Sequence, residues 1–177
     1  MKLLMAIVIG GVSVLVLAVA IAAGLGAATP RQHTASSVAE FHQPAESLYA
    51  ALADFEHAPR WRSDLSGVRR LPDRNGHAIW EQQAGDGVWP LEIREATPPS
   101  RLVTATADTS QGLGGTWTFV IEPRHEGARV TITETGTVDH LLMRFVTHRF
   151  VDLHATQKTF LRDLGRRFGE TVAPESR

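Results

Sequence analysis

The sequence contains no cysteine, which excludes disulfides, thiol nucleophiles, cysteine-based zinc sites and a cysteine-linked lipid anchor. It also lacks a charge excess, since 18 Lys and Arg stand against 19 Asp and Glu, for a net charge of −1. Nucleic-acid binding depends on a concentrated basic face that neutralises phosphates. We therefore expect no nucleic acid among the partners.

Familiar catalytic and metal-binding motifs are missing as well. No serine stands in a G-x-S-x-G setting, and the glycines at 112, 114 and 115 match neither a P-loop nor a dinucleotide fingerprint. His140, His148 and His154 lie eight and six residues apart, so they do not form the i, i+4 pair that places two imidazoles on one helix face. We expect no metal site, no cofactor and no catalytic apparatus of a named class.

One long apolar segment stands at the amino terminus. It runs from Leu3 to Ala23 without a charge, and a helix of this length spans roughly 30 Å, the thickness of the hydrocarbon core of a bilayer. Residues 1–28 are therefore predicted to be a transmembrane anchor that contacts the lipid bilayer. The alternative is a cleaved signal peptide, with Lys2 as its positive start, although the apolar core of such a signal usually measures about 7–15 residues.

The charges flanking this segment favour an amino terminus inside the cell. Lys2 precedes the segment, and Arg31 is the nearest cation after it. The soluble domain is then expected outside the cytoplasm, in a single-pass membrane protein. Residues 29–35, which include Pro30, are interpreted as a short linker that keeps the domain near the bilayer.

Residues 36–172 are predicted to form one α+β domain, followed by a tail at 173–177. Pro44 suits the first turn of a helix over 45–53, and a break at 57–59 is followed by Trp61. Turn residues punctuate a strand series, and a helical apolar period then extends over 141–168. The expected strands are 37–42, 65–71, 77–83, 88–95, 101–108, 116–122 and 128–138.

Three segments carry a resemblance to a known family. They are "FHQPAESLYAALADFEHAPRW", "GARVTITETGTVD" and "HLLMRFVTHRFVDLHATQKTFLRDLGRRFGE". Together they resemble the START/Bet v 1-like superfamily, also called SRPBCC or polyketide cyclase/dehydrase proteins, over residues 36–170. The resemblance implies a helix-grip fold, in which a curved antiparallel sheet of about seven strands wraps a long C-terminal helix. It also implies a cavity between sheet and helix that accepts an apolar or amphipathic small molecule.

Strand alternation predicts which side chains face that helix. Residues two apart share one face of a strand. The aromatic and aliphatic positions of the later strands are therefore expected on the sheet face that is shielded from water, the dry face. The helix is expected to present Phe145, Phe150 and Leu153 to them. The candidate ligand-binding residues are Trp80, Gln82, Trp89, Leu91, Trp117, Phe119, Ile132, Glu134 and Phe145.

Glu134 breaks the apolar pattern of its strand. It has the parity of Val130 and Ile132, and an unpaired carboxylate on a dry face is costly or carries a raised pKa. It is a candidate acid, base or ligand contact. The alternative interpretation is that a bulge or the strand end turns it toward water or an arginine, and Gln82 is a second candidate polar contact.

Three functions remain open from the sequence. The first is a membrane-anchored binding protein for an apolar or amphipathic small molecule. The second is a cyclase- or aromatase-like enzyme, which requires at least two convergent polar groups. The third is an interaction module whose interior is filled by its own aromatic side chains.

Overall fold

The computed structural model describes residues 2–85, 87–110 and 112–177. It divides into two compact units. A helical unit consists of the chain up to His33 and Thr137–Val151, and a sheet unit consists of Thr34–Gly136 and Asp152–Arg177.

The helical unit is built on α1 (Lys2–Ala28) and α3 (Leu141–Phe150). Within α1, Ile7–Ala28 has a mean hydropathy of 2.6 and is long and apolar enough to cross a membrane. A signal sequence has the same properties. The predicted apolar segment therefore forms a helix; Met1, at the start of the predicted 1–28 segment, lies outside the described residues.

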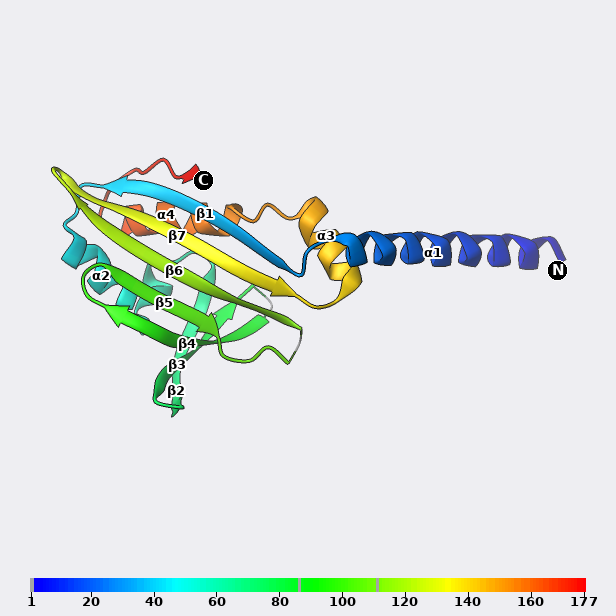
Figure 1. Ribbon diagram of the computed structural model, residues 1–177, viewed down its shortest axis with the longest axis horizontal. Coiled ribbons are helices and arrows are strands. Elements are labelled where there is room, and N and C mark those ends of the chain that lie inside the picture. The colour runs from blue at the N-terminus through cyan, green and yellow to red at the C-terminus, as the bar shows by residue number, and fades with distance from the viewer. Residues whose placement is uncertain (1, 86, 111) are drawn as a thin grey trace. The chain divides into compact units, whose positions relative to one another are not determined.

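The sheet is antiparallel and has eight strands in the order β2-β3-β4-β5-β6-β7-β1-β8 (Figure 1). The two-residue β8, absent from the seven expected strands, forms where the predicted tail pairs with Ser37 and Val38 of β1. The strands are β1 (Gln32–Phe41), β2 (Leu65–Arg74), β3 (His77–Ala84), β4 (Gly87–Thr97), β5 (Arg101–Thr106), β6 (Leu113–Arg124), β7 (Gly127–Val138) and β8 (Glu175–Ser176).

The linker is shorter than predicted. Because β1 begins at Gln32, residues 32–35 belong to a strand. The Val138 amide donates a hydrogen bond to the Arg31 carbonyl, which extends the pairing of β7 and β1 to this point. Only residues 29–31 remain between α1 and the sheet.

The turn between β2 and β3 follows the expected chemistry. Asn75 and Gly76 have φ angles of 53° and 79°, as the two central residues of a tight hairpin turn require, and asparagine and glycine tolerate these values best. The turn expected at 85–87 includes Asp86, which lies outside the described residues.

The predicted long C-terminal helix is two helices, α3 and α4 (Ala155–Arg167). Asp152 provides a physical reason for the break, because its carboxylate accepts a hydrogen bond from the His154 amide and its carbonyl accepts one from Ala155. Phe150 was expected to face the sheet, but its side chain is 73% exposed. Only α4 of these two helices therefore contributes side chains to the described core.

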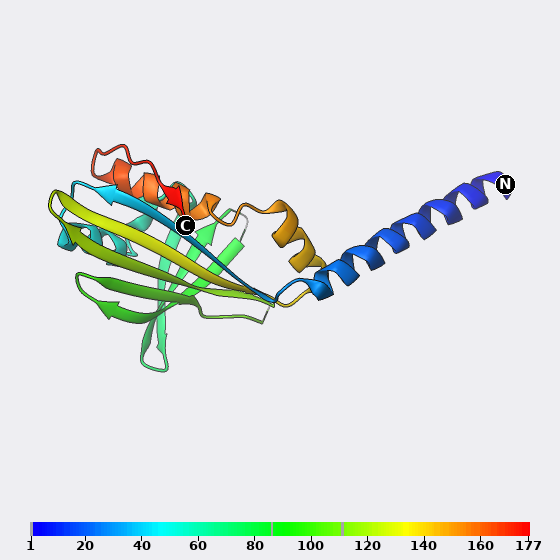
Figure 2. The same ribbon diagram turned by 45° about the horizontal axis from the view of Figure 1, so that its top comes forward.

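The core of the sheet unit lies between one sheet face and the helices α2 (Ala45–Ala53) and α4. We call this sheet face the inner face. Figures 1 and 2 show α4 lying along it. Phe160, Leu161 and Leu164 of α4 are buried against Phe119, Ile121 and Ile132. A short 3-10 helix, η1 (Ala58–Arg60), connects α2 to β2.

Candidate ligand-binding site

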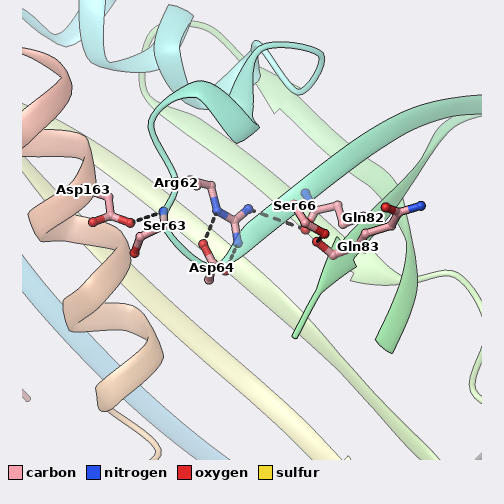
Figure 3. Close-up of polar contacts among 7 residues, drawn as sticks. All are labelled: Arg62, Ser63, Asp64, Ser66, Gln82, Gln83 and Asp163. Carbon is pink, nitrogen blue, oxygen red and sulfur yellow. Dashed lines mark hydrogen bonds and ion pairs between the residues drawn. The ribbon is translucent and has the colours of Figure 1, made fainter. Parts of the chain in front are cut away.

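The segment between η1 and β2 is held against α4 by a buried carboxylate. The Ser63 amide donates a 2.6 Å hydrogen bond to Asp163 of α4, whose side chain is fully buried (Figure 3). Arg166, one helical turn along, also donates to Asp163. These bonds fix the direction in which the preceding residues, Trp61 and Arg62, project.

Arg62 extends from this segment to the inner face of the sheet. It donates 3.0 and 2.5 Å hydrogen bonds to the carboxylate of Asp64, and a longer one of 3.5 Å to Oε1 of Gln82 on β3 (Figure 3). The guanidinium also lies 4.8 Å from the ring centroid of Phe160. The Arg62 side chain is only 12% exposed, and the Asp64 carboxylate balances its charge. The guanidinium therefore brings several N–H donors among apolar side chains.

Phe160 is the centre of an aromatic cluster. Its ring centroid lies 5.4 Å from that of Trp61, 6.1 Å from Trp117 and 5.3 Å from Phe119. A second pair, Phe55 and Trp80, stacks at 5.8 Å. Aromatic surfaces with a few polar groups are the usual lining of small-molecule sites.

Three polar atoms of the sheet unit are buried with no hydrogen-bond partner among the described residues: Trp61 Nε1, Gln82 Nε2 and Gln157 Oε1. Each glutamine has one satisfied end, because Gln82 Oε1 accepts from Arg62 and Gln157 Nε2 donates to the Ala35 carbonyl. These bonds determine which end is unsatisfied. An unpaired buried polar group costs about 1–3 kcal/mol, so each of these three atoms calls for a hydrogen-bond partner.

The cross-strand register places most predicted site residues on the inner face. Trp80 lies opposite Leu91, and Gln82 lies opposite Trp89; directly opposed side chains share one face of a sheet. Trp89 was expected in the dry interior, but its side chain is 42% exposed. The predicted site residues that pack in or against the core are Trp80, Trp117, Phe119 and Ile132.

Glu134 and Phe145 stand apart from this group. Glu134 is half-buried and has an interaction partner. Phe145 belongs to α3 in the helical unit, where its ring contacts Phe150 at 6.0 Å. Nothing in the sheet unit therefore assigns Phe145 to the candidate site, and its role as a ligand contact stays a prediction.

Among the polar members of the site, Gln82 was a candidate from the sequence, whereas Trp61 Nε1, Arg62, Gln157 and Asp163 were not. Gln157 lies three and four residues before Phe160 and Leu161, so it interrupts the buried stripe of α4. That interruption was a readable signal. Arg62 and Asp163 gave none, because their roles depend on a loop conformation that only the tertiary contacts determine. Within the described ranges, no group of three His, Cys, Asp or Glu residues has the arrangement of a metal site.

Hydrogen bonds between His57 and Asp54 also stabilise the turn that leads into the site. Burial raises the pKa of Asp54, but hydrogen bonds from His57 to its carboxylate outweigh that effect, and the pKa is lowered overall. A lowered carboxyl pKa in the folded state stabilises the protein above the unfolded-state pKa, and this contribution is lost as the pH falls through the folded-state pKa.

We expect Asp54→Asn to reduce stability at neutral pH, and the difference from the unsubstituted chain to shrink in strong acid. Urea unfolding at several pH values measures both quantities. A difference that does not depend on pH would contradict this assignment of the Asp54–His57 pair.

Comparisons with known proteins identify the architecture. The family model "Polyketide cyclase / dehydrase and lipid transport" matches residues 32–169. A search of curated proteins finds no match. Similar solved structures include the di-domain ARO/CYC StfQ from the steffimycin biosynthetic pathway, with a TM-score of 0.62 and 13% identity over 75% of this chain. The match covers 49% of StfQ, so this chain spans about half the length of that protein.

Two further structures match over most of their own length. Norcoclaurine synthase from Thalictrum flavum, solved with dopamine and hydroxybenzaldehyde, has a TM-score of 0.61 at 9% identity, covering 81% of this chain and 89% of that one. The ZhuI aromatase/cyclase from Streptomyces sp. R1128 has a TM-score of 0.58 at 10% identity, covering 75% and 91%. At these identities the likeness establishes the fold, and the fold alone does not specify the chemistry.

Proposed function

Because the chain belongs to the polyketide cyclase/dehydrase and lipid transport family, we propose that its domain binds an apolar or amphipathic small molecule between the inner sheet face and α4. The observation that supports this most strongly is that Trp61 and Gln82, which lie at the Phe160 cluster, each carry an unpaired buried polar atom. Both atoms, Trp61 Nε1 and Gln82 Nε2, are donors. The ligand is therefore expected to carry acceptor oxygens on an apolar, preferably aromatic, skeleton.

A matched pair of variants tests this assignment. Gln82 is buried on the inner face, whereas its neighbour Gln83 is exposed on the other face. Gln82→Leu removes the unpaired donor and is expected to weaken binding about three- to ten-fold, the size of one net hydrogen bond. It is expected to change stability little, since the unsatisfied donor and the long 3.5 Å hydrogen bond from Arg62 are lost together. Gln83→Leu should change neither affinity nor stability.

The measurement is a titration of the full chain in lipid nanodiscs, read by quenching of tryptophan fluorescence. The ligands are hydroxylated aromatic compounds, isoprenoids and fatty acids, with sugars and nucleotides as polar controls. Equal affinities for the two variants would contradict the role of Gln82. If no apolar compound gives a saturable response, the binding proposal itself is wrong and the interaction-module alternative gains support.

A cyclase- or aromatase-like activity is a second candidate, supported by the convergence of Arg62, Gln82 and Trp61 near one aromatic cluster. Convergent donors of this kind can stabilise negative charge that develops on a carbonyl oxygen. Its test is turnover of a polyketone substrate by the full chain, compared with Arg62→Gln.

Glu134 is expected to act as a structural polar residue in either case. It is half-buried and has an interaction partner, and a single carboxylate is an incomplete catalytic apparatus. Glu134→Gln should leave the affinity for the ligand within about two-fold of the unsubstituted chain, since hydrogen-bonding shape is kept. Loss of a defined turnover with an intact fold would contradict this and make Glu134 a candidate catalytic acid or base.

We also propose that α1 anchors the chain in a membrane, with its amino terminus in the cytoplasm and the sheet unit outside. The length and hydropathy of Ile7–Ala28 support anchoring. The position of Lys2 before the apolar segment supports the orientation. A tethered domain samples membrane-soluble compounds at high local concentration, in agreement with an apolar ligand.

A further inference from the structure

The last turn of α1 touches the first residue of α3. Gly26 is buried, and a Cβ atom built on it would lie 1.8 Å from the Leu141 carbonyl oxygen. Only a residue without a side chain permits this approach of the two backbones. The two helices, both in the helical unit, meet at this point (Figure 2). Because Ile7–Ala28 is the candidate membrane span, α3 begins at the level of the bilayer at which that span ends.

The polar side of α3 is hydrogen-bonded to the end of β7 through Arg144. Arg144 donates hydrogen bonds of 2.7 Å to the Val138 carbonyl and 2.8 Å to the Asp139 carbonyl. The Asp139 carboxylate in turn pairs with Arg31, and this hydrogen bond holds the pKa of Asp139 below its usual range. These contacts fix which way the helix faces within the helical unit.

The opposite side of α3 is apolar and largely exposed, with Val146 half-buried. Leu142, Val146 and Phe150 follow one another at intervals of four residues and so share a helix face; residues two positions along, such as Arg144 after Leu142, lie about 200° away. Leu142 is 44% exposed and Phe150 73% exposed, and the neighbouring Met143 is 42% exposed. No residue of α3 is buried.

We propose that α3 is an interfacial helix whose apolar side enters the lipid bilayer at the boundary between head groups and acyl chains. This inference rests on the proposed anchoring of α1, since contact with the end of a membrane span is what places α3 at that depth. Residues 140–151 contain no acidic side chain, and Arg149 and His148 lie in the last turn. The positive charge of Arg149 fits a surface of anionic lipid head groups.

The absence of cysteine from the chain allows a direct test. Single-cysteine variants Leu142→Cys and Phe150→Cys place an environment-sensitive fluorophore on the apolar side, and His148→Cys, an exposed position six residues after Leu142, provides the control on the polar side. Each full chain is reconstituted into vesicles of phosphatidylcholine and phosphatidylglycerol. Flotation reports anchoring. Quenching by nitroxide-labelled lipid and by aqueous iodide reports the location of each label.

The expected result is co-flotation of all three variants, with strong loss of fluorescence to lipid nitroxide at positions 142 and 150 and little at 148. Labels at 142 and 150 that are quenched only by iodide, in chains that float, would overturn the interfacial helix and leave the anchor intact. Labels shielded from both quenchers would show a protein surface covering α3, a second copy or another chain, and would also overturn it. Failure to float would refute the anchor and this inference together.

Discussion

Replacing Phe160 by alanine is expected to lower the free energy of unfolding by about 3–5 kcal/mol, the usual cost of removing a buried aromatic ring. The side chain is 5% exposed. It contacts the rings of Trp61, Trp117 and Phe119, and Arg62 lies over its face. The site and the sheet-to-helix packing therefore depend on the same residue, and the substitution should also abolish measurable ligand binding.

The control for this prediction is Phe150→Ala, the same chemical change at a position 73% exposed in α3. It should change stability by no more than about 0.5 kcal/mol, as surface substitutions usually do. Urea unfolding of the full chain in a mild detergent, followed by tryptophan fluorescence, measures both values. Equal effects of the two substitutions would mean that α4 does not pack on the sheet as described.

Deleting residues 2–28 is expected to move the protein completely from the membrane fraction to the soluble fraction. The deletion removes the candidate span Ile7–Ala28 and ends before β1 at Gln32. Insertion of about 20 apolar residues is effectively irreversible, so the full chain should resist extraction by alkaline carbonate. Immunoblotting of pellet and supernatant measures the distribution.

The N-terminal residue of the mature protein provides the complementary measurement. An intact terminus in the membrane pellet supports the anchor. A mature protein that starts near Thr29 and is found in the soluble fraction would show that the apolar helix is a cleaved signal.

Strand periodicity predicted the inner face well. Trp117, Phe119 and Ile132 share a face with the core because a period of two is a local property of extended chain. The hairpin turn at Asn75 and Gly76 was predictable for the same reason, since its chemistry lies in the residues that make it. The family resemblance over residues 36–170 agrees with the family match over 32–169.

The helical break and the contacts of Arg62 and Asp163 could not be predicted in the same way. An apolar period continues across residues 141–168, but Asp152 interrupts the helix through hydrogen bonds that compete with helical ones. Ser63 and Asp163 are 100 residues apart in sequence, but a 2.6 Å hydrogen bond joins them in the fold. Arg62, next to Ser63, is brought to the site by the same contact. Such contacts become visible only once the chain is folded.

Photocrosslinking tests most directly whether an apolar ligand binds between the inner sheet face and α4. The full chain in nanodiscs is irradiated with a diazirine-bearing hydroxylated aromatic compound and digested, and the labelled residues are identified by mass spectrometry. Binding at this site predicts labels on peptides containing Trp61, Trp117 or Phe160, suppressed by excess of the compound without the diazirine. Labels confined to α1 and exposed surfaces, or unaffected by the competitor, would contradict it.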